Sequence, residues 1–250
     1  MAYVLTFLHY AIFFVAIMVF HPIQAFCHRF VGYKSQMWVV NFMNFFLYNN
    51  IRVLGAKPHF LGIENIPKGV PIIFISNHQS MFDVIGFVWN LRAFHPKYVA
   101  KKELAHGIPS ISYNIRHGGS VLIDRNDPRQ AIAEIGKMGK YIETTKRSVV
   151  IFPEGTRSRD GSMKPFQLGG AMMLLKKSPS AVVVPVCIQN LWKLEQFSQN
   201  QMPKPLGGNY YFNVLKPIDR AGKTNEEIVK EAENAIINYQ IAVPNTPKTA

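Results

Sequence analysis

Two short apolar runs constrain the fold of this chain most, because each ends directly in a cluster of polar residues. The run at residues 71–76 leads into the polar segment 77–83, and the run at 148–152 leads into the polar segment 153–158. The first run is rich in Ile and the second in Val and Ile, and each contains a Phe, which predicts buried strands. Ligand sites in α/β sheets favour the ends of strands. We therefore expect the two polar segments to lie at one edge of a sheet and to form one site.

From about residue 58, short apolar runs alternate with longer helical stretches. This pattern is typical of strand–helix repeats around a largely parallel sheet, so we expect an α/β fold in which one domain has a largely parallel mixed sheet flanked by helices. The predicted strands are 70–76, 97–101, 119–124, 148–153, 181–188 and 209–216. The predicted helices are 82–93, 108–117, 128–145, 164–177 and 224–241.

Residues 1–57 are predicted to be a membrane-associated segment. The stretch from Val4 to Phe20 is almost wholly apolar, and it is only slightly shorter than the ~20 residues of a spanning helix. A second stretch, 37–48, is too short to span and indicates an interfacial helix. The two stretches form either a hairpin embedded in one leaflet or a single span through residues 3–20 with an interfacial helix; a pair of buried core helices is the alternative. The catalytic domain would be 58–243 and the tail 244–250 would be loose.

The charge balance predicts an anionic partner. The chain has 28 Lys and Arg against 15 Asp and Glu, a net charge of +13, which suits a membrane surface, phosphorylated small molecules or nucleic acid. Residues 1–63 contain four basic residues and no acidic one, which favours an anionic leaflet and a main domain on the cytoplasmic side. We expect no nucleic-acid partner, because neither zinc-finger spacing nor an RNA-recognition aromatic motif is present.

His78 and Asp83 are candidate catalytic residues. Five residues apart on a regular helix, they would point about 140° away from each other. They can meet if His78 lies in the turn after the strand and Asp83 lies in the first turns of the next helix. The carboxylate would then hold one imidazole nitrogen while the other acts as a general base. The alternative is a structural histidine near a helix start, with Asn77 as the helix cap.

Four segments occur in an order and at spacings that resemble a known family. They are the His78-x4-Asp83 pair after an apolar strand, the segment 119–125, the segment 152–158 and the Val-Pro-Val run at 184–186. Together they resemble the glycerolipid acyltransferase family, which acylates lysophosphatidic acid. The resemblance spans roughly residues 58–220, and residues 101–104 also resemble the family's segment between its first two motifs.

The resemblance implies a role for each matched residue. His78 would remove the proton of an acceptor hydroxyl that attacks an acyl thioester, and Asp83 would orient the imidazole. No acyl-enzyme is implied, so Ser76 and Ser80 are expected to be structural. Metal bound by His78, Asp83 and Glu154 is a thin alternative, and we expect no metal and no cofactor. The residues expected to bind the acceptor are Lys101, Arg125, Glu154, Gly155, Thr156 and Arg157.

The function that the resemblance implies is transfer of a fatty acyl group from acyl-CoA or acyl carrier protein to 1-acyl-glycerol-3-phosphate. Arg125 and Arg157 each follow a predicted strand, where a guanidinium can hold a phosphate in bidentate fashion. Other acceptors in the same reaction class are glycerol 3-phosphate and a phosphate-free lyso-aminolipid. A hypothesis of another class is a non-catalytic basic module that binds membranes.

Overall fold

The computed structural model describes residues 2–195 and 207–243, so the predicted loose tail lies outside the described residues. Within these ranges, seven strands form one sheet with the order β1-β7-β6-β2-β5-β3-β4. β7 is antiparallel to β6, whereas the other neighbouring strands pair in parallel. The predicted largely parallel mixed sheet is therefore confirmed. The strands are β1 (Ala56–Leu61), β2 (Ile72–Ser76), β3 (Pro96–Lys101), β4 (Val121–Ile123), β5 (Ser148–Ile151), β6 (Val182–Gln189) and β7 (Gly208–Val214).

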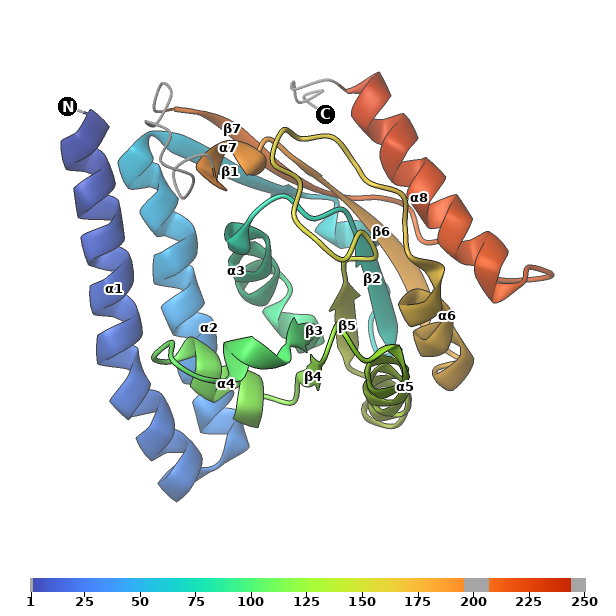
Figure 1. The fold of residues 1–250 in the computed structure, drawn as a ribbon, viewed down its shortest axis with the longest axis horizontal. Helices are drawn as coiled ribbons and strands as arrows, with labels where there is room; N and C mark the ends of the chain where they lie inside the picture. The colour runs from blue at the N-terminus through green and yellow to red at the C-terminus, as the bar shows by residue number, and fades with distance from the viewer. Residues whose placement is uncertain (1, 196–206, 244–250) are drawn as a thin grey trace.

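Helices cover both faces of the sheet (Figure 1). On one face lie α1 (Ala2–Phe26), α2 (Tyr33–Asn50) and α3 (Met81–Asn90), and on the other lie α5 (Pro128–Thr145), α6 (Leu168–Lys177) and α8 (Asn225–Ala242). Successive strand side chains point to opposite faces, so Phe74 packs with the first helix group while Ile73 and Ile75 pack with the second. The short helices α4 (Ile111–His117) and α7 (Trp192–Glu195) complete the described helical elements, together with a π-helical turn and short 3-10 turns.

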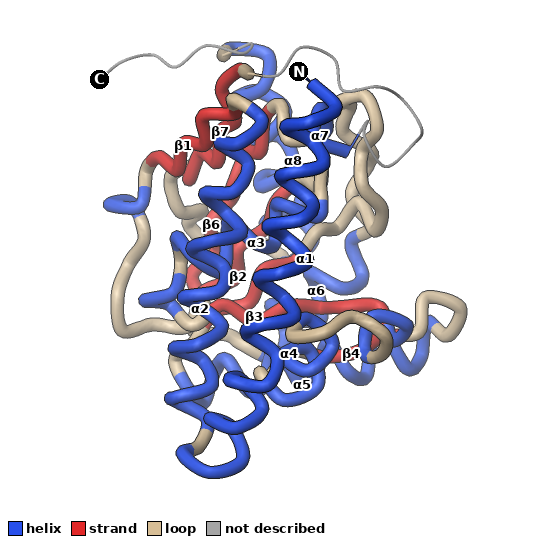
Figure 2. Tube along the Cα trace, turned by 90° about the vertical axis from the view of Figure 1, so that its left-hand side faces the viewer, coloured by secondary structure: helices blue, strands red, loops and turns tan. Residues whose placement is uncertain are grey.

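The apolar segment at the start of the chain folds as a helical hairpin. α1 continues into a π-helical turn, Cys27–Val31, and the chain reverses at Gly32, whose φ of 110° favours glycine. α2 then runs back beside α1 (Figure 2). Phe13 of α1 and Leu47 of α2 belong to the same buried core as the sheet residue Phe74. The hairpin and the sheet therefore share one continuous core.

The outer surface of this hairpin is strongly apolar. Among the described residues, the one helical segment long and apolar enough to cross a membrane is Ala2–Val31; its most apolar 18-residue window has a mean hydropathy of 2.2 and is 22% buried. Large apolar side chains that remain exposed on α1, the π-helical turn and α2 include Phe7, Phe14, Met18, Phe26, Phe30 and Trp38. By length and composition the segment is a candidate membrane anchor.

Strand β1 and the position of Pro185 within the sheet are not apparent from the sequence pattern. Strand β1 was not predicted, because Lys57, Pro58 and His59 interrupt its apolar pattern, yet it pairs with β7 at the sheet edge. Proline in a strand predicts an edge or a bulge, but Pro185 lies in the interior strand β6. Its carbonyl accepts from Leu215 N (2.9 Å) on the side of β7, where the β6–β7 ladder begins only at Val186. The missing N–H of Pro185 therefore falls where no strand partner is required.

Candidate active site

The parallel pairing of β2 with β5 brings the two polar segments together. Ile75 of β2 lies opposite Ile151 of β5, and both strands then end within a residue. His78 and the loop 152–158 consequently emerge at the same edge of the sheet. Ser158 N donates to His78 O (2.7 Å), and the imidazole stacks on the Phe152 ring with the centroids 4.1 Å apart. The expectation that the two polar segments lie together at one edge of the sheet is confirmed, and that they form one functional site stays a prediction.

His78 and Asp83 form a hydrogen-bonded pair. His78 Nδ1 lies 2.7 Å from Asp83 Oδ2, and 16% of the His78 side chain is exposed whereas the Asp83 side chain is fully buried. An ionised carboxylate only accepts hydrogen bonds, so the proton of the neutral imidazole is assigned to Nδ1. Nε2 is then the nitrogen with a lone pair that can accept a proton, and the partial exposure of the ring leaves it reachable from the edge of the sheet.

The same carboxylate helps to begin helix α3. Ser80 is the N-cap residue, its hydroxyl accepts from Phe82 N (3.1 Å), and Asp83 completes a capping box at the third helical position. Asp83 Oδ2 also accepts from Gln79 N (2.6 Å) and Ser80 N (2.9 Å). The helix cap is therefore Ser80, and the alternative role of Asn77 as cap is wrong because the helix begins later than that role requires. Ser80 has the structural role expected of it.

Glu154 lies beneath the histidine turn. It is 3% exposed, Oε1 accepts from His78 N (2.7 Å) and Oε2 accepts from Lys164 N (2.9 Å). Burial raises the pKa of Glu154, and the two backbone donors oppose that shift. Both carboxylate oxygens are thus used to join the loop 152–167 to His78. Contact of Glu154 with the acceptor stays a prediction.

The turn after Glu154 has the backbone expected from its glycine. Gly155 has a φ of +70°, and a Cβ there would lie 3.0 Å from Gln167 Nε2. Gly155 N donates to Phe152 O (3.1 Å), which closes a tight turn. Thr156 is exposed, and its hydroxyl accepts from Lys164 Nζ (2.7 Å). Gly155 therefore has a positive φ, which favours glycine, and Thr156 lies at the surface of the same loop.

The predicted basic residues lie along the carboxyl edge of the sheet. Lys101 ends β3 and pairs with Ile123, which ends β4 two residues before Arg125. Desolvation lowers the pKa of Arg125, and the Arg157 charge lowers it further, while Glu103 opposes the shift. Arg125 and Arg157 are therefore near enough to influence each other. Binding of a phosphate by these two guanidinium groups stays a prediction.

The backbone donors of the histidine turn have partners of their own. An oxyanion could be held by N–H groups at such a turn, but those of His78, Gln79 and Ser80 all donate to carboxylates. These three groups are consequently not available to an oxyanion in this structure. In the described part of the chain, no group of three or more His, Cys, Asp and Glu residues is arranged to hold a metal ion; catalysis without metal stays a prediction.

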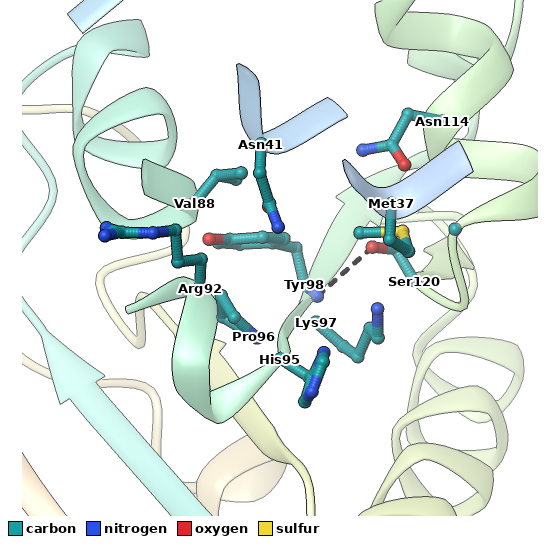
Figure 3. Close-up of a pocket in the computed structure, with 11 residues that line it drawn as sticks. Met37, Asn41, Val88, Arg92, His95, Pro96, Lys97, Tyr98, Asn114 and Ser120 are labelled. Carbon is teal, nitrogen blue, oxygen red and sulfur yellow. Dashed lines mark hydrogen bonds between the residues drawn. The ribbon is translucent and has the colours of Figure 1, made fainter. Parts of the chain in front are cut away.

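A buried lysine at the opposite end of β3 was not identified from the sequence. Lys97 is 1% exposed, and Nζ donates to the Tyr33 hydroxyl (2.6 Å), which also accepts from Arg147 (3.1 Å). The small pocket beside Lys97 is lined in part by Ser120, whose hydroxyl accepts from Tyr98 N (3.3 Å; Figure 3). Burial and the Arg147 charge lower the pKa of Lys97 to about 7. This cluster joins α2 to the sheet and is separate from His78.

Three comparisons place the chain among known proteins. Residues 57–189 match a family model described as Acyltransferase. A 1-acyl-sn-glycerol-3-phosphate acyltransferase of Saccharomyces cerevisiae is 31% identical over 185 residues, which is 72% of this chain and 58% of that protein. The corresponding alpha enzyme of Mus musculus is 25% identical over 180 residues, 72% of this chain and 61% of that protein. The chain thus spans about three fifths of the length of these two relatives.

A solved structure has the same fold. The crystal structure of the 1-acyl-sn-glycerophosphate acyltransferase PlsC from Thermotoga maritima matches with a TM-score of 0.64. The match covers 94% of this chain and 97% of that chain, at 23% sequence identity. Because the coverage includes nearly all of this chain, the helical hairpin belongs to the shared architecture along with the sheet.

Proposed function

Since the chain belongs to the acyltransferase family, we propose that it transfers a fatty acyl group from a thioester donor to the 2-hydroxyl of 1-acyl-glycerol-3-phosphate, giving phosphatidic acid. The observation that carries this proposal is the His78–Asp83 pair at the carboxyl edge of the sheet, next to a loop that bears Arg157. A general base and an adjacent cationic group are what acylation of a phosphate-bearing alcohol requires.

The proposed chemistry follows from the tautomer of His78. Asp83 accepts from Nδ1 and stabilises the imidazolium that forms. Nε2 takes the proton of the acceptor hydroxyl as its oxygen attacks the thioester carbonyl carbon. The tetrahedral intermediate then collapses, the carbon–sulfur bond breaks, and the imidazolium returns the proton to the thiolate. The products are an ester and a free thiol, and no acyl-enzyme forms.

The cationic edge supports an acceptor that carries phosphate. Arg125 and Arg157 influence each other electrostatically, and Lys101 ends the strand beside β4. Acyl-CoA and acyl carrier protein are both anionic donors that would be attracted by a chain with a net charge of +13. The exposed apolar face of the hairpin supports association of the protein with a membrane. We further propose that the catalytic domain lies on the cytoplasmic side of that membrane.

Thiol release by the purified full chain in lipid or detergent tests the proposal. Acyl-CoA and acyl carrier protein serve as donors, and 1-acyl-glycerol-3-phosphate, glycerol 3-phosphate and a phosphate-free lyso-aminolipid serve as acceptors. His78→Ala should lower kcat by about 10²- to 10⁴-fold, as expected for loss of a general base. Arg157→Ala should lower kcat/KM for the phosphate acceptor by roughly 10- to 100-fold, since a hydrogen bond to a charged group contributes about 1.5–3 kcal/mol.

Arg159→Ala is the matched control, because Arg159 is an exposed arginine two residues along the same loop; its activity should equal that of the wild type. Full activity of His78→Ala would show that His78 is not the base. Turnover restricted to the phosphate-free acceptor would overturn the proposed substrate. Absence of thiol release with either donor would instead favour the basic membrane-binding module.

A further inference from the structure

The side chain of Asn77 joins the histidine turn to a neighbouring strand. Asn77 is 1% exposed, Nδ2 donates to Ile188 O (2.8 Å) and Oδ1 accepts from Ile188 N (2.7 Å). Strand β2 ends one residue earlier at Ser76, which lies opposite Val186 of β6. The carboxamide thus binds both backbone groups of one residue, just beyond the last pair of the β2–β6 ladder.

This arrangement lets the backbone leave the sheet without losing its attachment to β6. Buried N–H and C=O groups require partners, and the Asn77 side chain supplies both partners for Ile188. The Asn77 carbonyl accepts from Ser76 Oγ (3.0 Å) instead of joining a strand. Among side chains of this length, an amide has both a donor and an acceptor, whereas a carboxylate has acceptors alone.

The loop after β5 holds the next residue. His78 N donates to Glu154 Oε1 and His78 O accepts from Ser158 N, both at 2.7 Å. The histidine backbone is therefore fixed to the β5 side through two bonds, and the residue before it is fixed to the β6 side through two more. Because the two anchors lie on opposite sides of β2, together they define where the imidazole projects from the sheet edge.

We propose that Asn77 is a positioning residue for acyl transfer, acting through His78; this inference rests on the proposed function. Reacting groups must be held to a fraction of an ångström, and a misplacement of about 1 Å can lower a rate about 10²-fold. Removal of the Asn77 amide releases one of the two anchors and leaves the Ile188 N–H and C=O without partners. The imidazole then varies in position relative to the attacking hydroxyl, while the groups that bind the substrates are unchanged.

Asn77→Ala and Asn77→Asp test the proposal, with Asn213→Ala as the matched control. Asn213 is a buried asparagine, 3% exposed, that also bonds to β6, with Nδ2 3.3 Å from Cys187 O and 3.2 Å from Gln189 Oε1. Both Asn77 variants should lower kcat about 10²-fold and leave the KM for acceptor and donor within about twofold. Asn77→Asp should lower kcat as much as Asn77→Ala, because its carboxylate would face the Ile188 carbonyl and has no hydrogen to donate to it. Asn213→Ala should lose stability but keep kcat.

A measurement that needs no turnover separates this inference from the proposed function. In protein with ¹⁵N-labelled histidine, the Nδ1–H proton of His78 should give a downfield signal that His78→Ala removes. We expect Asn77→Ala to shift or broaden it and Asn213→Ala to retain it. An unchanged signal with kcat near the wild-type value in Asn77→Ala would overturn the positioning role, as would an equal loss of kcat in Asn213→Ala. If the wild-type protein transferred no acyl group, the proposed function would be overturned. The Nδ1–H signal would still show whether Asn77 holds His78 in position.

Discussion

At the scale of single residues, one carboxylate connects the chemistry of the site with the start of a helix. Asp83 Oδ2 accepts from the imidazole of His78 and from two backbone N–H groups of the turn. A carboxylate buried in the protein interior requires such hydrogen-bond donors. The orientation of the imidazole and the stability of the first turn of α3 consequently depend on the same atom.

Replacement of this carboxylate should therefore affect activity and stability together. We expect Asp83→Asn to lower kcat by about 10³-fold or more, because the amide no longer fixes the Nδ1–H tautomer of His78, and to lower the free energy of unfolding by about 1–3 kcal/mol. The control is Thr224→Ala, which removes the capping box of α8 and should lower stability by about 1 kcal/mol with kcat unchanged. Thiol release and urea unfolding measure the two effects. Wild-type kcat in Asp83→Asn would contradict the orienting role.

The sequence predicted this pair because its geometry is local. A strand end, a turn and a helix start lie within residues 72–83, so the meeting of His78 and Asp83 depends on few residues. The contacts of Glu154 and Asn77 depend on which strands become neighbours, since their partners lie 76 and 111 residues away. Residue spacing alone does not reveal such contacts. Glu154 and Asn77 could therefore be singled out in the sequence, but their hydrogen-bond partners could not be predicted.

At the scale of elements, the predicted helix boundaries agree with the structure where residues at the helix ends give a local signal. Helix α5 occupies the predicted range 128–145, because Asp127 caps it and Pro128 suits its first position. Helix α6 was predicted from residue 164 but begins at Leu168. The residues before it are bound by distant groups: Lys164 N donates to Glu154, and Gln167 N donates to Pro153 O (2.9 Å). Tertiary contacts there prevail over helical periodicity.

Helix α3 is held close to the sheet by a glycine. A Cβ added at Gly86 would lie 2.3 Å from the Phe212 ring of β7, whereas one added at Gly136 of α5 would lie 3.5 Å from Met173 Sδ, an ordinary contact. We expect Gly86→Ala to lower the free energy of unfolding by about 1–3 kcal/mol through overpacking. Gly136→Ala should be neutral or stabilising by up to about 1 kcal/mol, because alanine is the better helix former. Urea unfolding of both variants tests this difference, and equal stabilities would contradict it.

The junction between α2 and β3 should give the protein a pH-dependent stability. The pKa of Lys97 is lowered from 10.5 to about 7 by burial and by the Arg147 charge. The unfolded chain therefore binds more protons than the folded one between these values, and stability rises with pH across that window. Lys97→Met removes this contribution, so the variant should gain stability relative to the wild type at pH 7, and the difference should shrink as the pH approaches 9. A difference that stays constant from pH 7 to 9, measured by urea unfolding, would contradict the buried-amine account.

At the scale of the whole molecule, the exposed apolar surface of the hairpin and the edge of the sheet that bears His78 lie around the same core. The hairpin α1–α2 packs against α3, and α3 begins with the residues that orient His78. The remaining sides of the protein carry α5, α6 and α8 (Figure 1). A flat bilayer that contacts the hairpin cannot also cover the opposite helical layer. The proposed lipid substrate would thus be presented from the side that bears the hairpin.

The exposed face of α1 should therefore determine binding to lipid. Phe7 is 76% exposed and Phe14 is 60% exposed, and seven residues apart they lie on the same side of the helix. We expect Phe7→Ser with Phe14→Ser to reduce sedimentation of the protein with anionic vesicles by at least about tenfold, because burial of each phenylalanine contributes roughly 1.5–3 kcal/mol. The control is Ile241→Ser on α8, an apolar residue that is 72% exposed in the opposite helical layer, and it should leave vesicle binding unchanged. Equal binding by the wild type, the double variant and Ile241→Ser would show that α1 is not the membrane contact. Binding would then be due to charged surface residues, and it should disappear at high salt.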